Sequence, residues 1–388
     1  MTAFADVSLP SESEEVWRYS RISELDLSAY TPLSAERAPE PGMPDELDAI
    51  VAAAGPYAAL AVVRNGRLAQ LDVRHDGVVV EGGDADPIPG ESDVFTSLNR
   101  QYAAESIVVR IRRAAVVEQP VLVVHLIDAE GAAVFPRLIV EAGEASQATV
   151  LDHVASPADV QALLVPVVQL NVADAATLSY LNVQELGPHV WQIGYQTSQV
   201  ARDATLQSSL VALGGDYARV RTDSRLSGQG ATSNLLAVYF GDGSQTHDFR
   251  TMQDHEAPKT TSDLLFKGAV EDQAHSVYTG LIRVRKGAAG TNAYQTNRNL
   301  VLTEGAHADS VPNLEIEEND VRCSHASAVG PIDEDQRYYL EARGVPTDVA
   351  DRLIVLGFFD EIINRTPIEG LRPRLRRAVA AKLEGAAQ

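Results

Sequence analysis

A short residue pair recurs at a nearly constant interval through the middle of the chain. The pair Ala-Thr occurs four times there, with separations of 28, 28 and 27 residues. Its positions are Ala148-Thr149, Ala176-Thr177, Ala204-Thr205 and Ala231-Thr232. Apolar residues at strand-like spacing follow the pairs, as in residues 177–181 and 232–236. A repeat of this length predicts a solenoid, and strand-forming units with few prolines favour a β-helix over helical repeats.

The pattern changes on both sides of this region, so we expect an all-β core with α-helical ends. Residues 1–58 form an N-terminal helical or irregular region, in which the Trp-Arg-Tyr-Ser island at 17–20 is expected to dock on the body. The β-helix core is predicted over 59–330, becoming regular from about residue 138. It opens with a tight hairpin at Asn65-Gly66, because this dipeptide adopts positive φ angles readily.

The later turns of the core are expected to be shorter than the early ones, with corners at three places. These corners are Lys286–Gly290, Glu304–Ala308 and Glu318–Cys323. Residues 331–388 are predicted to form a C-terminal helical domain. Its first helix is capped by Asp333 and ended by Gly344, and its second runs from Thr347 to about Asn364.

The second helix carries apolar residues on two stripes, which indicates burial on two sides. One stripe is Val349, Leu353, Leu356 and Ile363, and the other is Ile354, Phe358 and Ile362. A third helix follows Pro367 and carries five basic residues: Arg372, Arg374, Arg376, Arg377 and Lys382. We favour a solvated basic face for this helix, and a docking surface is the alternative.

Composition limits the classes of partner. The chain has 54 acidic and 32 basic residues, a formal charge of -22, which repels phosphate backbones and anionic membrane surfaces. No run approaches the roughly 18 apolar residues of a membrane helix, and the start lacks a basic region followed by an apolar segment, so we expect a cytoplasmic protein. The single cysteine, Cys323, excludes an internal disulfide and a four-thiolate cluster site within one chain.

Conventional enzyme motifs are missing, including the phosphate-binding loop, the nucleophile elbow and the His-Glu-x-x-His zinc motif. His247 and His255 would share one face of an unbroken strand, and we favour structural, hydrogen-bonded histidines over a metal pair. Cys323 and His325 stand at i and i+2, where both point to the same face of a strand. Both are good ligands for iron, although a buried thiol beside an inert histidine is the plainer interpretation.

A series of segments in the C-terminal half resembles the SufB/SufD family in order and spacing over roughly residues 205–365. The segments are Tyr239–Phe249, Asp254–Pro258, Ser262–Gly268, Val277–Val284, Thr291–Leu300, Pro312–Ile316, Cys323–His325 and Tyr338–Gly344. Residues 17–20 resemble the N-terminal signature of the SufD branch. Asn297 stands where SufB members carry a cysteine, and Cys323-Ser324-His325 replaces their Glu-His-Glu-like segment, so the resemblance is to the SufD branch.

This resemblance implies a right-handed parallel β-helix that joins a SufB-like paralogue along the solenoid. It also implies a non-catalytic subunit in the cytoplasm, with ATP hydrolysis in a SufC-type ATPase bound to the C-terminal helices. We assign the SufC docking residues to the second helix, as Leu353, Leu356, Gly357, Phe358 and Phe359. A homodimer of the isolated chain is left open.

By the same resemblance, His325 takes part in iron capture or nascent cluster binding at the SufB interface, and Cys323 helps or simply packs. No cofactor is expected to be stably bound by the chain alone, only transient iron or an iron–sulfur cluster shared with SufB. Two other functions compete with this one: a β-helix enzyme acting on acidic polysaccharide, and an inert structural β-helix protein.

Overall fold

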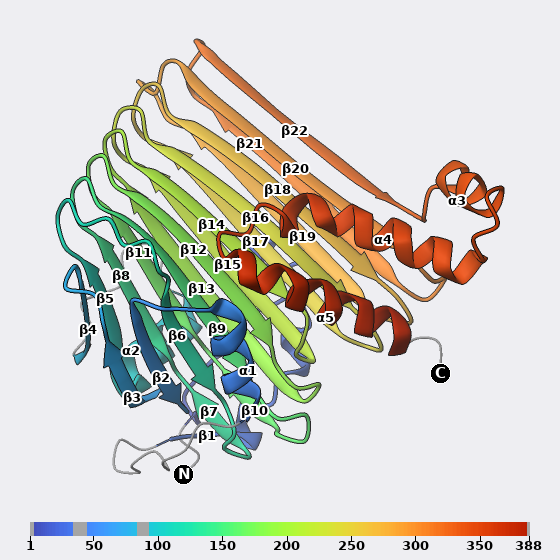
Figure 1. The fold of residues 1–388 in the computed structure, drawn as a ribbon, viewed down its shortest axis with the longest axis horizontal. Coiled ribbons are helices and arrows are strands. Elements are labelled where there is room, and N and C mark those ends of the chain that lie inside the picture. The colour runs from blue at the N-terminus through green and yellow to red at the C-terminus, as the bar shows by residue number, and fades with distance from the viewer. Residues whose placement is uncertain (1–3, 34–44, 84–92, 386–388) are drawn as a thin grey trace.

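Two long, mostly parallel sheets wind into a β-solenoid in the computed structural model, which describes residues 4–33, 45–83 and 93–385 (Figure 1). The chain visits the sheets alternately, so each coil adds one strand to each. Sheet A contains β5 (Ser106–Ile111), β8 (Arg137–Ala142), β11 (Val167–Val172), β13 (Val190–Val200), β15 (Tyr217–Leu226), β17 (Thr246–His255), β19 (His275–Val284) and β21 (His307–Ile316). Sheet B contains β2 (Ala59–Arg64), β6 (Val121–Leu126), β9 (Gln147–Ala155), β12 (Thr177–Glu185), β14 (Thr205–Ala212), β16 (Thr232–Gly241), β18 (Thr261–Val270), β20 (Thr291–Val301) and β22 (Val321–Gly330). The predicted parallel β-helix with helical ends is confirmed.

The early coils have an additional short face. It consists of β1 (Thr31–Pro32), β7 (Ala132–Val134) and β10 (Ala162–Leu164), with β10 pairing the first residues of β13. None of the helices in the described ranges is both long and apolar enough to cross a lipid bilayer.

The strand register confirms the repeat but corrects its details. Thr177, Thr205 and Thr232 are direct partners on neighbouring strands. Thr149 is not in this row, because Thr177 pairs with Gln147, 30 residues earlier. The expected shortening of the later turns is wrong: Thr232 to Thr261 is 29 residues and Thr261 to the partner Asn292 is 31. The strands of sheet B do not shorten either, with 9 residues in β12, 10 in β16 and 11 in β20.

The solenoid interior changes character along its length. One inward row of sheet B runs through consecutive strand partners from Tyr180 by way of Leu235 and Leu264 to Gln295 and His325. The first coils fill this space with valine, leucine and tyrosine, which form one apolar cluster with sheet A. In β20 the buried inward residues include the amides Gln295, Asn297 and Asn299. Buried polar groups therefore join the apolar core in the last coils, where Ile282 and Val284 still form an apolar cluster.

Helices cover the outer face of sheet B, so strands such as β16 and β18 are buried on both faces. They are α1 (Asp45–Ala54), α4 (Thr347–Ile363) and α5 (Arg372–Gly385), while α3 (Glu334–Glu341) projects beyond the last coils (Figure 1). Asp333 caps α3 as predicted, since its carboxylate accepts from the backbone amides of Asp335 and Gln336.

The two-stripe prediction for α4 is wrong. Its buried residues include Val355, Phe359 and Ile362, which lie at i, i+4 and i+7 on the side facing sheet B. Phe359 meets Phe240 with ring centroids 6.4 Å apart. Val349 and Leu353 remain exposed. One face of α4 is therefore core, and the other is available to solvent.

The basic residues of α5 are not the solvated face that was expected. Arg374 pairs with Glu185 at 2.7 Å and Lys382 pairs with Asp242 at 2.5 Å, both on the solenoid. Arg376 pairs with Asp360 of α4 at 2.6 Å. Burial opposes ionisation of Glu185, but hydrogen bonds from His153 and Arg374 outweigh it and lower its pKa to about 2. These ion pairs fix the orientation of α5 on the solenoid.

The N-terminal segment binds the outer face of sheet A, confirming that the 17–20 island docks on the body. Trp17, at the end of the short 3-10 helix η1 (Glu15–Trp17), is buried against Phe95 of α2 (Val94–Tyr102). The Arg219 guanidinium lies 4.0 Å from the centre of the Trp17 ring and donates to the carbonyl of Val16. Arg219 is in turn paired with buried Asp248. The segment thus covers charged groups that would otherwise face solvent.

The start of the solenoid closes over its own core. Asn65 and Gly66 have φ angles of 50° and 80° and form the predicted hairpin between β2 and the antiparallel strand β3 (Arg67–Val73). Antiparallel β4 (Val78–Gly83) pairs with β5 and buries Val78 and Val80. This end therefore exposes little of its inward-facing apolar surface.

We expect Trp17→Ala to release the N-terminal segment from sheet A, because a buried tryptophan contributes about 3–5 kcal/mol relative to alanine. Hydrogen exchange of residues 14–30 should accelerate at least tenfold, while β16, β18 and β20 of sheet B keep their protection. Val16→Ala is the matched control, since that side chain is exposed and its loss should change stability by less than about 0.5 kcal/mol. Equal exchange in the two variants would contradict the packing described.

Candidate functional site

The C-terminal end of the solenoid is open. β21 and β22 are the last strands of sheets A and B, so among the described residues their outer edges have no strand partner. Inward-facing Leu314 and Ile316 of β21 and Val329 of β22 are exposed, although their equivalents one coil earlier are buried. Unpaired strand edges beside uncovered apolar side chains form a surface suited to another chain.

Cys323 and His325 lie on the inward face of β22, at this open end. Cys323 pairs with Ala293 and is half-buried against an apolar cluster that includes Ile282 and Val284. Desolvation raises the pKa of its thiol, so a metal would have to displace a proton to bind there. His325 is exposed. The predicted pair is thus brought together, with the thiol deeper and the imidazole at the opening.

The surroundings of His325 are polar. Its strand partner Gln295 is buried, and the Gln295 amide nitrogen has no hydrogen-bond partner among the described residues. Ser327 donates to Ser310 across the opening at 2.7 Å. The Gln295 amide nitrogen could donate a hydrogen bond to a bound ion's water or to a partner chain, and the two serine hydroxyls could donate or accept one.

Asn297, which the sequence resemblance matches to a SufB cysteine, is fully buried in a satisfied network. Its amide donates to the Tyr239 hydroxyl at 2.9 Å, and Asn299 donates to its carbonyl oxygen at 2.8 Å. The network has no thiol and no exposed donor. In this chain the position holds the interior together and offers no acceptor for sulfur.

His247 and His255 are structural, as favoured from the sequence. His255 hydrogen-bonds the hydroxyls of Thr260 and Ser262, and His247 contacts the carbonyl of Phe240 at 3.3 Å. Burial lowers the pKa of His247 to about 3 and that of His255 to about 4, so both are neutral at physiological pH.

A hollow of about 730 Å³ lies between α3, α4 and the last coils. Of the predicted docking residues it includes Leu353, Gly357 and Phe358. The rest of the lining is partly apolar, with Leu300, Pro331, Tyr339, Leu340 and Ile354, and partly polar, with Asp333, Asp335 and Gln336. Leu356 is half-buried outside the hollow. Phe359 faces sheet B and is fully buried, so it supports the helix and cannot reach a docked partner.

A cluster that the sequence did not predict lies on the outer face of sheet A. His275 of β19 and His307 of β21 are direct strand partners, 32 residues apart, and both face Asp309. Local sequence could not reveal this group, because only the coil length brings the two histidines together. The strand register is the signal that would have found it.

Comparison with known proteins agrees with the architecture. The family described as "SUF system FeS cluster assembly, SufBD core domain" matches residues 125–358. An iron-sulfur cluster assembly SufBD family protein of Mycobacterium tuberculosis is 33% identical over 388 residues, covering 97% of this chain and 90% of that protein. The iron-sulfur cluster assembly protein SufD of Escherichia coli is 28% identical over 389 residues, covering 98% and 90%. SufD of Bacillus subtilis is 29% identical over 270 residues, covering 69% and 62%. The chain belongs to the SufBD family of iron–sulfur cluster assembly proteins.

Proposed function

We propose that this chain is the SufD-type scaffold subunit of an iron–sulfur cluster assembly complex, and that its open end joins a SufB-like paralogue. The observation that carries this proposal is the last coil, where no described strand pairs with the outer edges of β21 and β22 and where Leu314, Ile316 and Val329 are exposed. A related solenoid can continue both sheets by strand addition, which satisfies the free backbone groups and buries those three side chains. The complex would act in the cytoplasm.

In this proposal, iron or a nascent cluster binds at the interface between the open end and the SufB-like paralogue. His325 offers an imidazole at the opening, and Cys323 offers a thiol a few ångströms deeper along the same face of β22. Two protein ligands are too few for the usual four-fold coordination of an iron–sulfur cluster, so the paralogue must supply the remainder. Because the ligands are divided between two chains, the scaffold would hold iron or a cluster only when this chain and the paralogue are assembled.

The chain itself is proposed to be non-catalytic, with ATP hydrolysis in a SufC-type ATPase. The hollow beside α4 is the proposed docking site for that ATPase. It combines exposed Leu353 with half-buried Phe358 on a helix whose opposite face is anchored in the core. A rigid helix carrying apolar anchors can transmit a partner's movement to the last coils, since Lys267 of β18 donates to the carbonyl of Phe358 at 2.9 Å.

His325→Asn tests the role of the imidazole. The exposed side chain should be replaceable without loss of folding, and the variant should still assemble with the SufB-like and SufC-like partners and support ATP hydrolysis. Cluster output, measured by maturation of a reporter iron–sulfur protein in cells, should fall about tenfold or more, the range expected when metal ligation is impaired. His189→Asn, at another exposed histidine, is the control. Full cluster output from His325→Asn would refute the ligand role.

Leu353→Asp tests the docking hollow. A charge placed there should weaken binding of the SufC-type ATPase by about 30-fold or more, the loss of a central apolar anchor. Leu71→Asp on β3 is the matched control, because the two leucines are 49% and 41% exposed and Leu71 lies at the opposite end of the solenoid. Titration of each purified variant with the ATPase gives the comparison. If both variants bind as tightly as the unmodified chain, the docking site lies elsewhere.

A further inference from the structure

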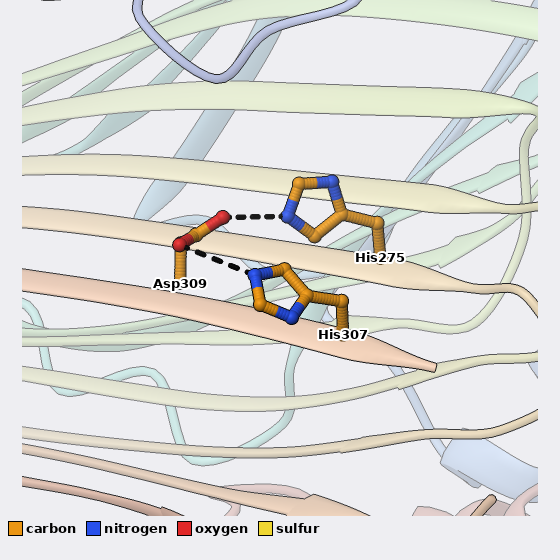
Figure 2. Close-up of side chains that lie close together, drawn as sticks. All are labelled: His275, His307 and Asp309. Atoms are coloured by element: carbon orange, nitrogen blue, oxygen red, sulfur yellow. Dashed lines mark hydrogen bonds and ion pairs between the residues drawn. The ribbon is translucent and has the colours of Figure 1, made fainter. Parts of the chain in front are cut away.

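We propose that His275, His307 and Asp309 bind a divalent first-row transition-metal ion on the outer face of the last two coils. This inference rests on the geometry of sheet A and does not depend on the proposed function. Figure 2 shows both imidazole rings turned toward the Asp309 carboxylate. The site is separate from Cys323 and His325, which lie on the inward face of the other sheet.

The three ligand atoms converge. The Nε2 atom of His275 is 2.8 Å from one Asp309 oxygen, and the Nε2 atom of His307 is 3.4 Å from the other. Taken one from each residue, the three ligand atoms lie within 4.8 Å of one another. Ligands around a tetrahedral ion are about 3.3 Å apart at metal–ligand distances of about 2.0–2.1 Å. Small side-chain rotations therefore suffice to close the site around an ion.

Rigid backbone places these ligands. His275 and His307 are directly opposite on parallel strands, and Asp309 follows two residues after His307, so the three side chains emerge on one face. The rings lie 5.2 Å apart between centroids. The His307 side chain is 67% exposed, whereas those of His275 and Asp309 are 28% and 24% exposed. Two ligands are thus held in place while one side remains accessible to water and to an incoming ion.

An ordinary ion pair would look different on this sheet. Other outward carboxylates of sheet A are paired with arginine, as Glu315 is with Arg283 on the same two strands at 3.0 Å and Asp223 is with Arg221 on its own strand at 2.9 Å. In the described ranges Asp309 has no arginine or lysine partner and faces two imidazoles instead. Two histidines with one carboxylate are the ligand set that iron(II), zinc and related ions prefer, whereas magnesium and calcium require oxygen ligands.

The test is metal binding by the full-length chain, stripped with a chelator and titrated with Zn²⁺, with Co²⁺ as a spectroscopic probe. We expect one saturable ion at this site, with Co²⁺ absorption typical of imidazole and carboxylate ligands. His275→Arg should weaken this binding at least tenfold while preserving the fold, because it removes one ligand and gives Asp309 an arginine partner on the neighbouring strand, as Glu315 has in Arg283. Asp309→Asn, which keeps the side-chain shape, should have the same effect. Exchange at the start of β21 should slow on addition of Zn²⁺ in the unmodified chain but not in His275→Arg.

The double variant Cys323→Ser, His325→Asn separates this site from the open end, and it should bind the ion with unchanged affinity. The inference is overturned if no saturable Zn²⁺ or Co²⁺ binding occurs. It is equally overturned if both His275→Arg and Asp309→Asn bind as tightly as the unmodified chain, or if the double variant alone loses the ion.

Discussion

In-register parallel pairing of successive coils is the constraint on which the rest of this structure depends. Most residues of an inner strand have a direct partner one coil earlier and one coil later, so a side chain's neighbours are fixed by coil length instead of by local sequence. Each coil buries its inward face only against adjacent coils. A terminal coil of such a solenoid has unpaired strand edges and an uncovered interior, so each end must be capped, covered or joined to another chain. The start is closed by β3 and β4, but β21 and β22 leave the other end open.

Local signals were sufficient to predict the class of fold. The repeat, the hairpin at Asn65-Gly66 and the Asp333 cap all act over a few residues or over a near-constant period, and each was found in the structure. The register error at Thr149 arose because Ala-Thr is a common pair that falls two residues from its structural equivalent. The environment of α5 could not be predicted, since Arg374 and Lys382 bind carboxylates 189 and 140 residues away.

The same limit applied to the candidate site. Strand alternation correctly placed Cys323 and His325 on one face, because that relation spans two residues. Local sequence patterns could not show that β22 is the last strand or that coil length aligns His275 with His307. Nor could they show that Phe359 of α4 points into the core. The buried amides Gln295, Asn297 and Asn299 of β20 also become visible as one inward group only once the coils are stacked.

The central claim is that the open end is an interface that continues the solenoid into a SufB-like chain. Hydrogen–deuterium exchange of this chain, alone and with that partner, tests it most directly. The claim predicts that amides of β21 and β22 exchange rapidly in the isolated chain and become protected at least tenfold in the complex, while β11 to β14 remain unchanged. Unaltered exchange of β21 and β22 in a complex shown to be fully formed would contradict it.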